Sequence, residues 1–119
     1  MAKILIADDS LAELQLFQQA LQPMGHTIMT VMDGEAAEEK LKSEKIDLIT
    51  LDVIMPKKNG FQVCRDIKSS ERLKNIPVIM VTSKDQESDK FWGMKQGADE
   101  YLTKPFQPED LQKAVKKYI

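Results

Sequence analysis

Short apolar runs alternate with longer amphipathic stretches along the whole chain. The runs are KILIA at 3–7, HTIMTV at 26–31, DLITLD at 47–52, PVIMVT at 77–82 and EYLT at 100–103. Three of them, 3–7, 47–52 and 77–82, are almost continuously apolar and rich in Ile, Val and Leu, which is typical of strands covered on both faces. Strict alternation of strand and helix predicts βαβ units with parallel strands and right-handed crossovers.

The stretches between the runs carry signals for helix starts. Ser10 and Glu13 have the spacing of a capping box, in which each side chain accepts a hydrogen bond from the backbone N–H of the other residue. Asp33 and Asp85 are expected N-caps of two later helices. Pro108 is expected in the first turn of the last helix.

These elements predict an α/β fold. Five strand–helix repeats in 119 residues fit a small doubly wound parallel sheet of flavodoxin-like order 2-1-3-4-5. The length is near the commonest domain size, so residues 1–119 are expected to form a single domain. The fifth helical pattern runs to the end of the chain, and we therefore expect no attached output domain.

Composition narrows the possible classes of protein. Hydrophobic residues make up 42% and charged residues 30% of the chain, which is ordinary for a globular protein. The net charge of −2 argues against direct binding of nucleic acid. The single cysteine, Cys64, forms no internal disulfide. The apolar run after Lys3 is too short for a signal peptide or a membrane span, so we expect a cytoplasmic protein with no membrane contact.

Most candidate site residues stand where a predicted strand ends. They are Asp8 and Asp9 after the first run, Asp52 at the end of the third, Thr82 and Ser83 at the end of the fourth, and Lys104 after the fifth. In a doubly wound sheet the ligand site lies outside the carboxyl ends of the strands. The pattern therefore predicts that three carboxylates, two hydroxyls and one ammonium converge at one edge of the sheet.

This set of groups indicates phosphoryl transfer to a carboxylate. Clustered carboxylates repel one another unless a cation lies among them. Mg²⁺ prefers oxygen ligands and commonly uses one or two carboxylates together with a phosphate, and a carboxylate is a competent nucleophile toward phosphorus. An Asp pair after a strand is by itself equally consistent with a helix N-cap and a solvated neighbour. The convergence of several such residues favours a site.

The chain resembles the receiver domains of bacterial two-component systems over its whole length. The matching pieces are ILIADDS at 4–10, ITLDVIMPKKNG at 49–60, VIMVTSK at 78–84 and GADEYLTKPF at 97–106. The resemblance implies a response regulator that accepts a phosphoryl group from a sensor histidine kinase. It implies a signal transducer whose only catalysis is its own phosphorylation and dephosphorylation.

The resemblance also implies roles for residues of the phosphorylation site. Asp52 is the expected phospho-acceptor. Asp9, Asp52 and the backbone carbonyl of Ile54 are expected to hold Mg²⁺, with Asp8 assisting through water. Ser83 is small and leaves room for the phosphoryl group.

The resemblance implies a second group of residues. These neutralise the charge of the phosphoryl group or change position when it is present. Lys104 is expected to pair with the phosphoryl group or with Asp52, and its peptide bond to Pro105 is expected to be cis. Thr82 is the expected switch hydroxyl and Tyr101 the switch aromatic. Movement of Thr82 toward the phosphoryl group would let Tyr101 turn inward, and the face of the fourth helix, fifth strand and fifth helix would change shape.

The partners follow from the same resemblance. The changed face is expected to bind a downstream protein, with the receiver as a monomer or as a dimer formed on activation. The chain resembles the single-domain subclass that includes the chemotaxis receiver. Residues 81–106 resemble receivers of the type IV pilus twitching-motility pathway.

Two positions near the expected path of the hydrolytic water differ from those of the chemotaxis receiver, which has polar or acidic residues there. Ile54 lies two residues after Asp52, and Lys84 lies two residues after Thr82. An apolar Ile54 cannot orient a water molecule, so we expect slower self-dephosphorylation than in the chemotaxis receiver. Both side chains are equally consistent with a solvated loop. Trp92, in the fourth helical stretch, is interpreted as a packing residue.

Four other functions share part of this residue pattern. A phosphate sink and a scaffold that has lost phosphorylation share every expected site residue. A phosphatase of the haloacid dehalogenase type also uses a nucleophilic Asp, Mg²⁺ and a Lys, but its nucleophile sits on the first strand. A flavodoxin-like cofactor binder needs a phosphate-cradling loop where Asp8 and Asp9 stand.

Overall fold

The computed structural model describes every residue from Met1 to Ile119. Its elements are β1 (Lys3–Ala7), α1 (Leu11–Leu21), the short 3₁₀ helix η1 (Gln22–Met24), β2 (Thr27–Val31), α2 (Gly34–Ser43), β3 (Leu48–Leu51), α3 (Gly60–Lys68), β4 (Val78–Thr82), α4 (Glu87–Lys95), β5 (Glu100–Thr103) and α5 (Pro108–Lys116). None of the helices has the length and apolar character that crossing a bilayer requires.

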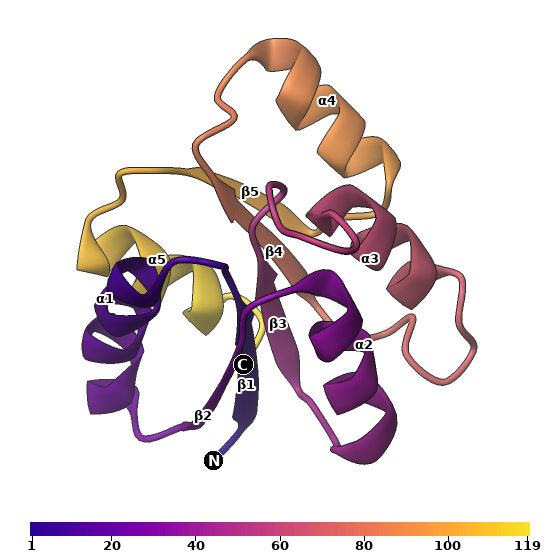
Figure 1. The fold of residues 1–119 in the computed structure, drawn as a ribbon. Coiled ribbons are helices and arrows are strands. Elements are labelled where there is room, and N and C mark those ends of the chain that lie inside the picture. The colour runs from indigo at the N-terminus through magenta and orange to yellow at the C-terminus, as the bar shows by residue number, and fades with distance from the viewer.

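All five strands are parallel and form one sheet in the order β2-β1-β3-β4-β5. Helices α1 and α5 cover one face, and α2, α3 and α4 lie on the other (Figure 1). The predicted fold class, strand order and strand positions are therefore confirmed. The order of the strands in space differs from their order in the chain at β1, which lies inside the sheet because β2 and β3 pair with its two edges.

Each face of the sheet has its own apolar core. Leu5, Ile49 and Met80 pack with residues of α2 and α3. Ile4, Ile6 and Ile79 pack with residues of α1 and α5. Neighbouring residues of one strand thus serve opposite cores, which explains why the central strands are continuously apolar.

The predicted helix starts are mostly confirmed. Ser10 caps α1 by accepting the backbone N–H of Glu13 at 3.3 Å, and Asp33 caps α2 by accepting that of Ala36 at 2.7 Å. Pro108 is the first residue of α5. Asp85 does not cap α4, so that prediction is wrong.

The N-cap of α4 is Gln86, whose backbone N–H donates to Asp89 Oδ2 at 3.2 Å. Asp89 fills this role because it lies in the first turn of α4, where a carboxylate reaches back to the cap residue. The interpretation of Trp92 as a packing residue is also wrong. Trp92, Phe91 and Met94 are all exposed, and Gly93 is the only residue of α4 that is buried.

Candidate functional site

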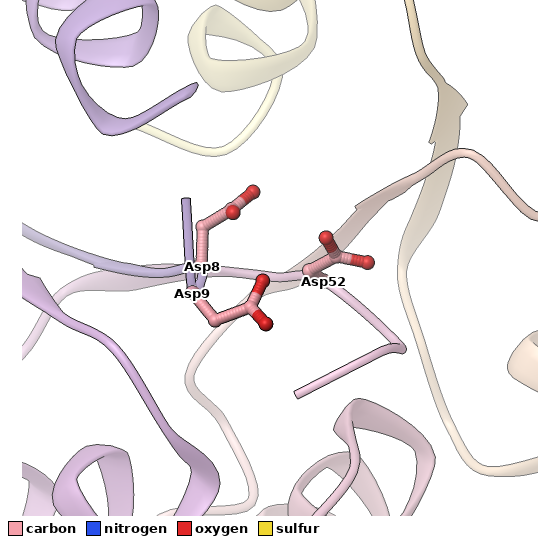
Figure 2. A group of neighbouring side chains, drawn as sticks. All are labelled: Asp8, Asp9 and Asp52. Atoms are coloured by element: carbon pink, nitrogen blue, oxygen red, sulfur yellow. The ribbon is translucent and has the colours of Figure 1, made fainter. Parts of the chain in front are cut away.

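Adjacent strands bring the three aspartates together. Ala7 lies opposite Leu51 in the register of β1 and β3, and the next residue on each strand is Asp8 and Asp52. The backbone N–H of Asp52 donates to the carbonyl of Ala7 at 3.1 Å. One carboxylate oxygen from each of Asp8, Asp9 and Asp52 lies within 4.8 Å of the others. Figure 2 shows the three side chains gathered at this sheet edge.

Lys104 supplies the positive charge of this cluster. Its ammonium donates to Asp8 Oδ2 at 2.7 Å and to Asp52 Oδ2 at 2.9 Å. Its backbone N–H donates to the carbonyl of Thr82 at 2.9 Å, which ties the segment after β5 to the end of β4. The peptide bond between Lys104 and Pro105 is cis. One cation therefore faces two carboxylates that come from different strands.

The family model of the response regulator receiver domain matches residues 4–116. The chain belongs to this family. It is 43% identical to Protein PilH of Pseudomonas aeruginosa, over 97% of the chain and 95% of PilH. It is 42% identical to the alkaline phosphatase synthesis transcriptional regulatory protein PhoP of Bacillus subtilis, over 96% of the chain, but it spans only 47% of that protein.

Solved receiver structures have the same fold. Chemotaxis protein CheY4 of Vibrio cholerae matches with a TM-score of 0.92 at 34% identity, over 100% of the chain and 99% of CheY4. The receiver domain of sensor histidine kinase PA1611 from Pseudomonas aeruginosa matches with a TM-score of 0.90 at 25% identity, over 98% of the chain and 96% of that domain. The PA1611 domain is described with a magnesium ion coordinated in its active-site cleft.

Membership of this family makes the chain a response regulator receiver of two-component signal transduction. It decides against the haloacid dehalogenase and flavodoxin alternatives, which require other folds or other loops after the first strand. The family match and the similar receivers support the resemblance that the four sequence motifs indicated.

Burial sets the electrostatics of the receiver's acidic cluster. Asp8 is almost fully buried, and this burial raises the pKa of its carboxyl, against the opposing effects of the hydrogen bonds from Lys104 and from the backbone of Ser10. Burial lowers the pKa of Lys104, but its hydrogen bonds to Asp8 and Asp52 outweigh burial and raise the pKa above its usual value. Lys104 therefore stays charged, and the carboxylates still favour a further cation.

The donor set fits a hard divalent cation. The three clustered aspartates offer only oxygen atoms, and the single histidine of the chain, His26, instead accepts a hydrogen bond from the backbone N–H of Ala2. Asp9 is exposed while Asp52 is mostly buried, so a cation here would keep water on one side. Partial hydration with carboxylate ligands is the coordination that Mg²⁺ prefers.

The remaining expected site residues surround the cluster. The backbone N–H of Ile54 donates to Asp52 Oδ1 at 3.2 Å, and the residue is 55% exposed. Thr82 is fully buried at the end of β4, and its hydroxyl oxygen accepts the N–H of Lys84 at 3.4 Å. Ser83 is exposed and lines an open cavity of about 430 Å³ together with Lys104 and Pro105.

Tyr101 on β5 is half-buried beneath α4. Its hydroxyl donates to the backbone carbonyl of Lys84 at 2.8 Å. Burial raises the pKa of this hydroxyl to about 12. The ring lies against Gly93, where an added Cβ would come within 2.9 Å of two ring carbons. Tyr101 thus bridges the segment after β4 and the helix that follows it.

Sequence reasoning missed Glu13. The predicted capping box sends its carboxylate to the backbone of Ser10, but that N–H donates to Asp8 Oδ1 at 3.0 Å instead. Glu13 Oε1 lies 3.2 Å from the Lys104 ammonium and lines the same cavity as Ser83. The prediction that Glu13 accepts a hydrogen bond from the backbone of Ser10 is therefore wrong. The physical reason is that a full positive charge attracts a carboxylate more strongly than a backbone amide does.

Proposed function

We propose that Asp52 accepts a phosphoryl group from the phosphohistidine of a sensor histidine kinase. An Asp52 carboxylate oxygen forms the new bond to phosphorus, the bond from phosphorus to the histidine nitrogen breaks, and the imidazole regains its proton. The product is an acyl phosphate on the receiver. The observation that carries this proposal is the position of the Lys104 ammonium, 2.9 Å from Asp52 and 2.7 Å from Asp8.

Mg²⁺ is the metal we assign to the acidic cluster. Asp9, Asp52 and the backbone carbonyl of Ile54 would hold it directly, and Asp8 would assist through water. Bound there, the metal neutralises charge on the phosphoryl oxygens during transfer. The all-oxygen donor set of this chain and the magnesium ion in the PA1611 receiver support the assignment.

The chain's own groups would stabilise the transferred phosphoryl group. Lys104 offers a charged donor beside Asp52, and it stays protonated because its pKa is raised. Thr82 offers a hydroxyl at the end of β4, and Ser83 leaves space beside Lys104. Self-phosphorylation and self-dephosphorylation at Asp52 are the only reactions we assign to the receiver.

The output is a changed surface on α4, β5 and α5. Phosphorylation would draw Thr82 toward Asp52 and favour the inward position of Tyr101 beneath α4, where its hydroxyl donates to the carbonyl of Lys84. Exposed Phe91, Trp92 and Met94 make α4 apolar enough to dock a protein partner. The receiver would act as a monomer or as a dimer formed on activation, in chemotaxis-like or twitching-motility signalling, and the similarity to PilH and CheY4 supports this setting.

Intact mass tests the proposal. The receiver is incubated with a small acyl-phosphate donor, with and without Mg²⁺, beside an Asp52→Asn variant. One labile phosphoryl adduct that needs both Asp52 and Mg²⁺ supports phosphotransfer. A folded protein that gains no adduct under any condition contradicts it and favours a non-phosphorylated scaffold. If the phosphorylated chain binds no partner but drains phosphoryl groups from another receiver through a shared kinase, a phosphate sink is favoured instead.

A further inference from the structure

Lys58 joins two helices through one ammonium group. It stands in the segment 53–59, which connects β3 to α3 and follows Asp52 directly. Its Nζ lies 2.8 Å from Glu38 Oε1 on α2 and 3.0 Å from Asp66 Oδ2 on α3. All three side chains are partly shielded from solvent. The ion pairs therefore connect a loop next to the site with the layer of helices beside it.

The backbone around Lys58 is held by further contacts. The N–H of Lys58 donates to the carbonyl of Pro56 at 2.8 Å, and the N–H of Gly60 donates to that of Val53 at 2.9 Å. At Gly34, the first residue of α2, an added Cβ would lie 2.0 Å from the carbonyl oxygen of Lys58. The segment thus packs directly on the start of α2, which only a glycine permits at this distance.

The two carboxylates depend on Lys58 for neutralisation. Asp66 also accepts a hydrogen bond from Gln62 Nε2 at 3.0 Å, whereas the second carboxylate oxygen of Glu38 is buried with no partner. Burial and the nearby Asp66 raise the pKa of the Glu38 carboxyl. Without the ammonium, two carboxylates would face each other with nothing between them, and the loop would lose its ion pairs to both helices.

We propose that Lys58 is a positioning residue for phosphorylation: by linking Glu38 on α2 to Asp66 on α3, it fixes the segment that carries Ile54 into the metal site. This inference rests on the proposed function, because it takes the Ile54 carbonyl as a metal ligand. Lys58 touches neither the metal nor the phosphoryl group. Its effect falls on Mg²⁺ affinity, since a ligand on a loosened loop binds the ion less well.

The chain offers a matched control at Lys3. Its ammonium lies 2.8 Å from Glu44, and its side chain is 33% exposed, close to the 31% of Lys58. Lys3 begins β1, whereas the acidic cluster follows the other end of that strand. Lys3→Met therefore removes a similar ion pair without loosening the loop after β3.

Mg²⁺ titration by calorimetry compares Lys58→Met, Lys58→Arg and Lys3→Met with the unmodified receiver. We expect Lys58→Met to weaken Mg²⁺ binding about tenfold, and saturating Mg²⁺ to restore most of its phosphorylation rate. Lys58→Arg, which keeps the cation, and Lys3→Met should both bind Mg²⁺ within about twofold of the unmodified receiver.

A Lys58→Met affinity within twofold of the unmodified receiver, or one shifted no more than that of Lys3→Met, overturns the proposal. If Lys58→Met fails to fold, Glu38→Gln provides the same test from the other side of the ion pair, with a smaller loss expected. If the unmodified receiver binds Mg²⁺ but gains no phosphoryl adduct, the proposed function fails while the affinities still decide the role of Lys58.

Discussion

The hydroxyl of Tyr101 donates a hydrogen bond of 2.8 Å to the backbone carbonyl of Lys84. This bond joins β5 to the segment between β4 and α4, two residues beyond Thr82. It gives the expected switch aromatic a defined position and couples that position to the backbone next to the expected switch hydroxyl.

Tyr101→Phe should lower the free energy of unfolding by about 1 kcal/mol, because it removes one partly buried hydrogen bond and keeps the ring. Urea denaturation measures the change. Tyr118→Phe is a useful comparison, since its hydroxyl donates to Asp99 and Glu100 and not to the segment between β4 and α4. If Tyr101 controls the switch, Tyr101→Phe should reduce the gain in partner binding that phosphorylation causes, whereas Tyr118→Phe should leave that gain unchanged. An equal loss of the gain in both variants would contradict that role.

Gly93→Ala should destabilise the receiver although alanine favours helix. The added methyl would lie 2.9 Å from the ring of Tyr101, and such overpacking costs about 1–3 kcal/mol, which equals or exceeds the roughly 1 kcal/mol gained in helix propensity. In a Tyr101→Ala background the ring is gone, so the same substitution should stabilise. Thermal denaturation of the four proteins in this cycle decides the matter, and destabilisation in both backgrounds would show that the ring is not the cause.

Glu13→Gln should speed phosphorylation by a small anionic donor. Glu13 adds negative charge beside Lys104, and one unit charge across a solvated site is worth about 0.5–1 kcal/mol, or about two- to fivefold in rate. The gain should shrink as salt rises. Glu39→Gln makes the same charge change on an exposed surface of α2 and should have little effect. An equal acceleration by both variants would indicate net charge rather than Glu13.

Ile54→Asn should speed loss of the phosphoryl group. An amide at this exposed position can hold the attacking water, and one hydrogen bond worth about 1 kcal/mol in the transition state corresponds to about a fivefold rate change. The decay of the adduct is followed by intact mass after removal of the donor. Ile119→Asn exchanges another exposed isoleucine far along the chain. An unchanged lifetime in Ile54→Asn would refute the slow-hydrolysis prediction.

Cys64 should make stability depend on pH in alkaline solution. Burial raises the pKa of its thiol from 9.0 to about 11, so the folded chain keeps this proton longer than the unfolded chain does. The protonated Cys64 thiol therefore contributes fully to the free energy of unfolding below about pH 9, and this contribution is lost as pH rises through about 11. Urea denaturation across this range should show a steeper fall for the unmodified receiver than for Cys64→Ala. Parallel pH profiles would contradict the prediction.

Local sequence patterns were sufficient to predict the five strands, the caps at Ser10 and Asp33, and the residues that meet at the sheet edge. The reason is that a continuously apolar strand must be covered on both faces, and parallel strands place their carboxyl ends together. Asp8, Asp52 and Lys104 could therefore be assigned to one cluster from their positions at strand ends.

The tertiary structure alone decided which charges pair. Glu13 has the spacing of a capping residue, yet its carboxylate lies by Lys104, which arrives from the far end of the chain. Lys58 is one lysine of a loop in the sequence, and only the packing of α2 beside α3 brings Glu38 and Asp66 to it. Periodicity specifies which face a residue occupies, whereas partners distant in sequence depend on how whole elements pack, and no local pattern encodes that arrangement.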